Sequence, residues 1–446
     1  MTYRTTLALL AVALASGPLF AARPVARWDV VPYQRVSGVF KVGVVAFHES
    51  GVNVLFKVDG RKKWSAKRPT KNDRTGVEEY VFPFDPVKCK CKPGPVTLSA
   101  TATSEGGESY DLPDLVLYAD PNGDLGSRKV VYVDPVKGND FADATRDAPV
   151  KTLGMGIKKA EDGGTVMLAA GRYRLDKIGI GKLREYWTTV QPAPGVDGSE
   201  VKVEGGRPVT DKLRFRDVDI FAKIGPDANL AIYVGEGRHP LFAWFDNCRM
   251  YNSEGRGSGR SMPFGNRLMA YVTGGRTSDV THGPRCELVR NHTVEKITGS
   301  AFSGSNALIA NCKVSDIDSD GSGVIASVLY EAQIQYPRWV DNVILFNVEA
   351  DNCKSRGLVG SRLRDSAFVN VKFATAARDE GNLTRFSLGL DNVIFRNVEI
   401  SGQDWIWVDN EFGLENVEPK DVVMENVKVD NYLGCDVSGF AGIRKK

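Results

Sequence analysis

A six-residue pattern that returns along the C-terminal two-thirds of the chain constrains the fold more than any other feature. In each copy an apolar residue is followed by any residue, Asn or Asp, a small or β-branched residue, any residue, and a second apolar residue. The central position is held by Asp217, Asn247, Asn311, Asn347, Asn370, Asn397 and Asn426, with an imperfect copy at Asn291. Successive centres lie 20 to 44 residues apart. This spacing is typical of a solenoid whose coils carry loops of variable length.

The chemistry of the pattern predicts how each coil is built. Asn tolerates the left-handed backbone of a sharp bend, and its amide can bond to the coils above and below, so we expect a ladder of Asn side chains. The next position packs against its own copy one coil away. We therefore expect Cys248 and Cys312 to be packing thiols. We expect His292, in the same slot, to be a buried, hydrogen-bonded residue, with a catalytic role as the alternative.

One helix is expected in this part of the chain. Leu153, Ile157 and Ala160 have helical spacing and precede a Gly-Gly pair that stops the helix. No other amphipathic helical stripe follows, which argues against a doubly wound α/β fold. The helix is expected to cover the open end of the solenoid, where backbone and core would otherwise face water.

The first third of the chain has a different character. A chain of 446 residues exceeds what one hydrophobic core usually fills, so two domains are expected. Short strands separated by Gly, Pro, Asn and Asp clusters are predicted at 39–47, 52–59, 78–84, 96–103 and 115–118. They predict an immunoglobulin-like β-sandwich over residues 23–119, a linker over 120–129, and the solenoid over 130–446.

Residues 1–22 have the organisation of an export signal. A basic start, an apolar run and small residues follow one another, and the run is shorter than the roughly 20 residues of a membrane-spanning helix, which is the alternative. We expect a cleaved signal peptide and a secreted or periplasmic monomer, with no membrane partner after cleavage.

The charge balance and the cysteine content argue against a nucleic-acid-binding protein and against a disulfide-stabilised fold. Lys and Arg (58) nearly balance Asp and Glu (55), and the basic residues are interpreted as scattered, so no nucleic-acid partner is expected. Seven Cys in a long chain, an odd number, do not form a disulfide framework. Cys89 and Cys91 could bind a metal, but no His or second Cys pair lies nearby in the sequence, so ordinary thiols are favoured.

Further motifs give a resemblance to a known family. The run from Val131 through Asp134, the Lys151-Thr152-Leu153 helix start, and the strand at Thr165 followed by Gly171-Arg172-Tyr173 resemble the beginning of bacterial pectate-lyase-like β-helix proteins. With the Asn repeats, the resemblance spans about 300 residues. It implies an all-β protein in which a small sandwich precedes a single-stranded right-handed parallel β-helix with an N-terminal cap helix. The reaction stays open, because that superfamily includes lyases, hydrolases, epimerases and binding proteins.

A substrate groove is predicted along one sheet of the β-helix. Its rungs are expected at 299–303, 321–327, 356–361, 385–389 and 404–409, with the segments 253–283 and 330–339 as walls. Cleavage of a uronate by a lyase needs a cation to neutralise the carboxylate and a base to take the C5 proton. Candidates for these roles, each weighed against an ordinary solvated residue, are Arg356, Arg362, Tyr330 and Arg338, with Lys354 and Arg364 as substrate ligands.

A glycoside hydrolase on the same fold is the enzymatic alternative. It needs two carboxylates across the scissile bond. Asp379 and Glu380 are candidates, and so are Asp409 and Glu411 beside Trp405 and Trp407, whose rings could stack on sugars. For the acids, turn formation or ion pairing is an equally good interpretation.

No cofactor is required by these motifs, and Ca²⁺ is the one candidate. Asp316, Asp318 and Asp320 precede Gly321 at alternate positions, like the start of a calcium loop, but the twelfth position holds Ser327 where such loops have Glu. A coil turn is therefore the favoured interpretation. The leading functional hypothesis is a lyase of an acidic polysaccharide, and the competing one is a non-catalytic carbohydrate-binding or surface protein.

Overall fold

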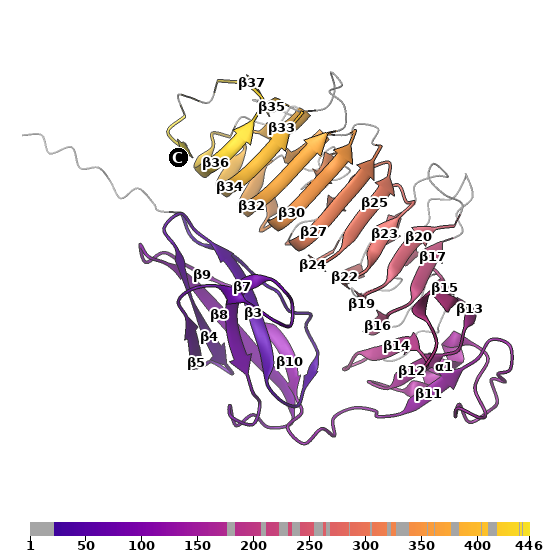
Figure 1. The fold of residues 1–446 in the computed structure, drawn as a ribbon. Helices are drawn as coiled ribbons and strands as arrows, with labels where there is room; N and C mark the ends of the chain where they lie inside the picture. The colour runs from indigo at the N-terminus through magenta and orange to yellow at the C-terminus, as the bar shows by residue number, and fades with distance from the viewer. Residues whose placement is uncertain are drawn as a thin grey trace, which may run out of the picture.

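The computed structural model describes residues 22–446 except 176–182, 207–210, 223–230, 234–240, 254–261, 265–267, 285, 304–305, 319–322, 327–338, 355, 361, 376–382, 403, 409–416, 437 and 439. The predicted signal peptide lies almost entirely outside the described residues. Two β structures follow one another along the chain, a sandwich and a long solenoid (Figure 1). No helix among the described residues has the length and apolar character needed to span a membrane.

The N-terminal part is a sandwich of two sheets. One sheet has the order β1-β3-β7-β6, and the other runs β2-β10-β8-β4-β5 with β9 beside β8. Alternate residues of β4 and β8 point into a shared core that includes Val54, Phe56, Leu98 and Ala100. The strands are β1 (Val25–Trp28), β2 (Arg35–Val36), β3 (Phe40–Phe47), β4 (Val52–Val58), β5 (Arg61–Ala66), β6 (Thr70–Lys71), β7 (Glu78–Phe84), β8 (Gly94–Ser104), β9 (Ser109–Asp111) and β10 (Leu115–Ala119).

The predicted helix forms at the start of the solenoid. α1 (Leu153–Ala160) begins at Thr152, whose hydroxyl accepts a hydrogen bond from the Met155 amide at 3.3 Å. Leu153, Ile157 and Ala160 are buried against the solenoid core. Figure 1 shows α1 at the N-terminal end of the stack, so the helix covers that end as expected.

Parallel strands build two sheets that meet at the Asn bend. The first sheet contains β11 (Val130–Val133), β12 (Thr165–Leu168), β14 (Thr188–Pro192), β16 (Leu213–Arg216), β19 (Leu241–Asp246), β22 (Leu268–Thr273), β24 (Leu288–Arg290) and β38 (Ile443–Lys445). The short strand β29 (Val340–Asp341) comes before it in its coil and pairs with the start of β32 at Leu363 and Arg364. The second contains β13 (Gly171–Arg174), β15 (Val201–Glu204), β17 (Asp219–Ala222), β20 (Arg249–Asn252), β23 (Arg276–Ser278) and β25 (Thr293–Ile297). Five longer strands pass through the bend and belong to both: β27 (Leu308–Ile317), β30 (Ile344–Cys353), β32 (Leu363–Thr375), β34 (Leu390–Ser401) and β36 (Lys420–Val429).

A third sheet closes the coils in the C-terminal half. It pairs β26 (Phe302–Ser303), β28 (Gly323–Ala326), β31 (Arg356–Gly360), β33 (Leu383–Ser387), β35 (Asp404–Val408) and β37 (Tyr432–Gly434). A separate pair is formed by β18 (Ala231–Tyr233) and β21 (Met262–Phe264), and η1 (Gly198–Glu200) is a short 3-10 turn. Three parallel sheets around one thin core confirm the right-handed parallel β-helix.

The core of the solenoid is built from equivalent residues stacked coil upon coil. The first apolar position of the pattern places Phe215 opposite Phe245, and Phe368 opposite Phe395. These ring pairs are stacked with centroids 5.7 and 5.1 Å apart. Cys248, Cys312 and His292 are each 1% exposed, as predicted for the slot after the bend.

The amide ladder is present and uses left-handed backbone. Every central residue from Asp217 to Asn426 has a φ between 51° and 54°. Asn347 donates to Asn311 at 3.0 Å, and Asn370, Asn397 and Asn426 each donate to the preceding Asn at 2.8 to 2.9 Å. The side chain of Asn therefore makes the bend possible and also joins one coil to the next.

The sandwich packs against the outer face of the first sheet. Val25, Val31, Val45 and Val77 of the sandwich join one apolar cluster with the solenoid residues Trp187, Trp244, Tyr271, Leu288, Leu308, Ala310, Ile344, Phe346, Ala367, Val369 and Ile394. The rings of Phe47 and Phe346 meet at 5.2 Å. The first sheet is thus apolar on both faces, and its outer face carries the sandwich.

Candidate functional site

The bend between the first and second sheets forms a concave corner on the outside of the solenoid. In its C-terminal half this corner is a groove of about 350 Å³, which crosses four successive coils. Its wall on one side is the amide ladder, from Asn347 to Asn426. The other side is a row of charged residues two positions after each Asn: Glu349, Lys372, Glu399 and Lys428.

The charged row alternates in sign. Glu349 is the cross-strand partner of Lys372, Lys372 of Glu399, and Glu399 of Lys428. All four side chains are exposed, and no ion pair within 4.0 Å joins any of these described residues. Because the charges are not neutralised at close range, they remain available to a ligand that lies along the corner. The six-residue repeat contains a signal for this row, because its second variable position reads Glu, Lys, Glu and Lys in these four coils. The row was nevertheless not predicted from the sequence.

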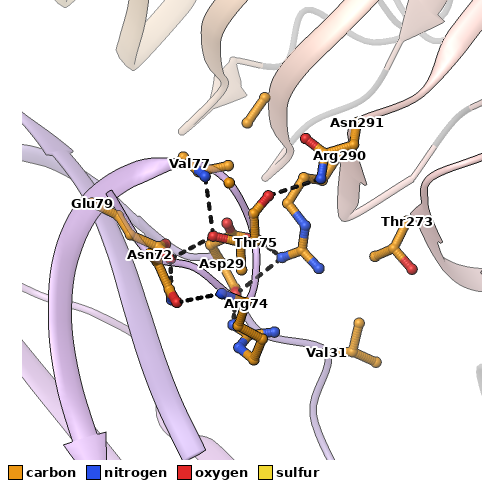
Figure 2. Close-up of polar contacts among 12 residues, drawn as sticks. Asp29, Val31, Asn72, Arg74, Thr75, Val77, Glu79, Thr273, Arg290 and Asn291 are labelled. Atoms are coloured by element: carbon orange, nitrogen blue, oxygen red, sulfur yellow. Dashed lines mark hydrogen bonds and ion pairs between the residues drawn. The ribbon is translucent and has the colours of Figure 1, made fainter. Parts of the chain in front are cut away.

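The middle of the same corner, at Asn291 and Asn311, is covered by the sandwich. The turn at 72–77, which links β6 to β7, lies on the ladder there, and Gly76 permits the turn with a φ of 72°. The amide of Asn291 donates to the Thr75 carbonyl at 2.8 Å (Figure 2). The amide of Asn311 donates to the Gly76 carbonyl at 3.1 Å. The side-chain amides of the ladder can therefore donate hydrogen bonds to acceptor oxygens of a group that enters the corner.

A buried ionic contact fixes this turn to the solenoid. Arg290 of β24 pairs with the carboxylate of Asp29, and Arg74 donates to the Asp29 carbonyl at 2.9 Å (Figure 2). The Asp29 side chain is fully buried and that of Arg290 is 7% exposed. Burial, reinforced by the nearby Asp29 carboxylate, raises the pKa of Glu79 well above its usual value. The contact surface is therefore an ordered interior and not a loose meeting of two domains.

The third sheet lies where the substrate groove was predicted. β28, β31, β33 and β35 fall within or beside the expected rungs. The indole rings of Trp405 and Trp407, however, are 0% and 2% exposed. Trp405 stacks on Phe386 with centroids 4.9 Å apart, inside the coil. The expectation that these two rings stack on sugars is therefore wrong, because both point into the core.

The predicted basic cluster does not converge on one point. Lys354 is exposed just before β31, and Arg356 begins this strand as the partner of Gly323. Arg362 and Arg364 follow the other end of the strand, which spans about 17 Å. The Arg364 guanidinium pairs with Asp341 at 2.7 Å, and this hydrogen bond raises its pKa further. Arg364 thus stays protonated and already has a carboxylate partner, and its predicted role as a substrate ligand stays a prediction.

The described acids do not form a metal site. Asp316 lies at a bend in β27 with a φ of 54° and accepts a hydrogen bond from the Asn352 amide, and Asp318 is exposed. In the part of the chain that the structure describes, no three His, Cys, Asp or Glu side chains are grouped to hold a metal ion. Asp320 lies outside the described residues. The described geometry is that of a coil turn.

The remaining candidates belong to segments next to the third sheet in the sequence. Tyr330, Arg338, Asp379, Glu380, Asp409 and Glu411 all lie outside the described residues. Their segments, 327–338, 376–382 and 409–416, follow or precede strands of the third sheet along the chain. The role of each stays a prediction.

His292 has the structural role expected for its slot. Its ring contacts the Thr277 hydroxyl at 2.9 Å and the Gly274 carbonyl at 2.8 Å. Burial lowers its pKa to about 4, so the ring is neutral at physiological pH. Burial likewise raises the pKa of the Cys312 thiol to about 12, which keeps it protonated and unreactive.

No protein-family model and no curated protein matches the sequence. Among solved structures, the chain is similar to the GH136 lacto-N-biosidase from Eubacterium ramulus, at 12% identity and a TM-score of 0.40, over 71% of this chain and 67% of that one. A Family 28 exopolygalacturonase from Yersinia enterocolitica matches at 10% identity and a TM-score of 0.30, over 93% and 88%. Fibronectin(III)-like modules of Clostridium thermocellum CbhA match 22% of this chain and 47% of theirs, at 16% identity and a TM-score of 0.16. These scores are low, so the β-helix assignment rests on the strand pairing and the ladder, and membership of the pectate-lyase-like superfamily stays a prediction.

Proposed function

We propose that the solenoid binds an extended polysaccharide and that the protein is an exported lyase of an acidic, uronate-containing polymer. The observation that carries the proposal is the corner groove, a straight channel over four coils lined by amides and unpaired charges. Neighbouring strands are about 4.8 Å apart, so the channel repeats its donors at a spacing that suits a chain of hydroxyl-rich units. Lys372 and Lys428 lie two strands apart, about 10 Å, and can each neutralise a carboxylate of such a chain.

Cleavage, in this proposal, takes place on the third sheet. A lyase must neutralise the uronate carboxylate and remove the C5 proton with a positioned base. The candidate groups are Arg356, Arg362, Tyr330 and Arg338, on or beside β31 and on the segment that follows β28. The sandwich packs on the first sheet, and in this proposal the polymer approaches the outer face of the third.

A non-catalytic polysaccharide-binding protein is the second candidate. It is favoured by one observation: among the residues that the structure describes, Arg364 is held in an ion pair, and the basic residues near β31 occupy positions at both ends of the strand. In this alternative the corner groove carries the whole function.

Incubation of the purified protein with a panel of uronate polymers tests the proposal. A lyase generates absorbance from an unsaturated product, a hydrolase releases reducing ends without it, and a binder is retained on the polymer with no product. The Lys372→Glu variant, which places three carboxylates in a row, should weaken retention on a uronate polymer. Lys137→Glu, an exposed change of equal charge far from the groove, is the control. Equal retention of both variants and the unaltered protein contradicts binding in the groove, and absence of any new product contradicts the lyase.

A further inference from the structure

The basic residues of the sandwich are concentrated on one edge, which the overall charge balance hides. Residues 59–68 and 85–92 contain eight Lys and Arg but only two acids, Asp59 and Asp85. We call this surface the basic edge and define it as Arg61, Lys62, Lys63, Lys67, Arg68, Lys88, Lys90 and Lys92. All eight are exposed. The expectation that basic residues are scattered therefore fails for this part of the molecule.

The two segments of the basic edge belong to one surface. β5 is an edge strand, paired only with β4. The Trp64 ring of β5 stacks near Phe82 of β7, with centroids 6.5 Å apart, and β7 leads directly into the turn at 85–92. Cys89 and Cys91 of that turn and Ala66 of β5 pack against the same apolar core cluster of the sandwich, which brings the turn next to β5. Figure 1 shows β5 on the side of the sandwich that faces away from the solenoid.

The charges of the basic edge are not used within the molecule. Lys88 lies 3.8 Å from Asp85, and no carboxylate among the described residues pairs with the other seven side chains. Lys62 even lies directly opposite Lys57 across β4 and β5, an arrangement of like charges that destabilises a strand pair. Lysines on an edge strand do discourage aggregation. That role explains one or two of them in β5, but it does not explain the three lysines of the turn.

A partly exposed aromatic ring, Trp64, lies on the same edge strand, opposite the core residue Phe56 of β4. Trp64 is 44% exposed, and its contact with Phe82 holds one side of the ring in place while the rest faces solvent. An indole held at the rim of the sandwich core, on an edge that also carries exposed Lys and Arg side chains, suits a ligand that has both apolar ring faces and negative charges. Sugar rings that carry carboxylate or sulfate groups have this chemistry.

We propose that the basic edge is a second binding surface, which docks an acidic polysaccharide through Lys and Arg contacts to its anionic groups and through stacking on Trp64. Single-stranded nucleic acid is bound in channels with several stacked aromatic rings, whereas Trp64 is the one aromatic ring among the described residues of the basic-edge segments 59–68 and 85–92. The inference goes beyond cleavage on the solenoid and stands whether or not the solenoid has any activity. It gives the sandwich a function of its own: it holds a polymer on the outside of the molecule.

Affinity electrophoresis of the full chain in gels that contain polygalacturonate or uncharged dextran tests the inference. The triple variant Lys62→Gln, Lys63→Gln, Lys67→Gln should bind polygalacturonate about tenfold more weakly, and the slope of log affinity against log salt should fall by about one for each lysine that no longer pairs with the polymer. The control triple variant Lys137→Gln, Arg146→Gln, Lys158→Gln removes the same charge from exposed positions around α1 and should retain affinity. Trp64→Ala should weaken binding without changing the salt slope.

Several outcomes would overturn the inference. Equal losses of affinity for polygalacturonate in the two triple variants would mean that net charge alone causes the effect. Retention of the unaltered chain in the dextran gel alone would exclude an anionic ligand. Tighter binding of single-stranded DNA or of vesicles with anionic lipid, at the same salt concentration, would assign the surface to those ligands instead. Unfolding midpoints of all variants, which should agree with that of the unaltered chain, exclude misfolding as the cause. If the solenoid does cleave its substrate, the basic-edge variant should cleave short oligosaccharides at an unchanged rate, so a failure of docking and a failure of catalysis are separable.

Discussion

The side-chain amide of Asn291 donates a hydrogen bond to the carbonyl oxygen of Thr75 at 2.8 Å, across 216 positions of sequence. Asn291 is a ladder residue of the solenoid, and Thr75 belongs to the turn of the sandwich that enters the corner. The sandwich therefore uses the same donors that the open half of the corner offers to a ligand. One feature of the coil, its Asn bend, thus serves the fold, the packing of the two domains and the proposed binding groove.

The ladder predicts a measurable stability effect. Asn370→Ala removes the hydrogen bond to Asn347 and the one from Asn397, and it leaves Ala at a φ of 54°. Two hydrogen bonds at about 1 kcal/mol each and about 1 kcal/mol of backbone strain predict a loss of about 3 kcal/mol in the free energy of unfolding. Denaturant titration measures it. Asn370→Gly, which avoids the strain, should lose about 1 kcal/mol less; a loss as large as that of Ala would show that backbone strain does not contribute.

The ion pair between Arg290 and Asp29 predicts how the domains are coupled. Arg290→Met leaves the buried Asp29 carboxylate without its partner, which should cost about 3 to 5 kcal/mol. In calorimetry the unaltered chain should unfold in one transition, and the variant should show the sandwich and solenoid unfolding separately. Arg276→Met, at a half-exposed arginine of the second sheet that pairs with Glu295 at 3.4 Å, is the control and should change little. Two transitions in the unaltered chain would contradict the coupling.

Sequence reasoning found the coil because its signals are local and repeated. The bend at each Asn, the packing slot of Cys248 and His292, and the cap helix all follow from residues within one coil. The docking of the sandwich was missed, although a signal existed: Trp244, Tyr271 and Phe346 occupy outward positions of the first sheet, and a sheet that is apolar on both faces must be covered. The orientation of Trp405 and Trp407 was wrong for a different reason. Alternation places the two rings on one face of a strand but does not say which face.

His292 predicts a pH dependence. Its folded-state pKa of about 4 lies below the ordinary value of 6.5, so the unfolded chain binds a proton between these values when the folded chain does not. The contribution of His292 to the free energy of unfolding is therefore fully present above about pH 6.5. It is lost as the pH falls toward 4, by up to about 3 kcal/mol. Unfolding free energies across this range should fall less steeply in His292→Val, which has the residue type found in the same slot of other coils. An identical slope in both proteins would contradict the buried neutral ring.

The core position of Trp405 gives the last prediction. Trp405→Ala removes a fully buried ring that stacks on Phe386, so the free energy of unfolding should fall by about 3 to 5 kcal/mol. Tyr432→Ala, at the 42% exposed partner of Trp405 on the next strand, should cost about 1 kcal/mol or less. Trp405→Phe keeps an aromatic ring in the core and should leave the affinity for a uronate oligosaccharide unchanged, as measured by calorimetric titration. A large loss of affinity in this variant, with stability retained, would mean that the indole ring contacts the sugar after all.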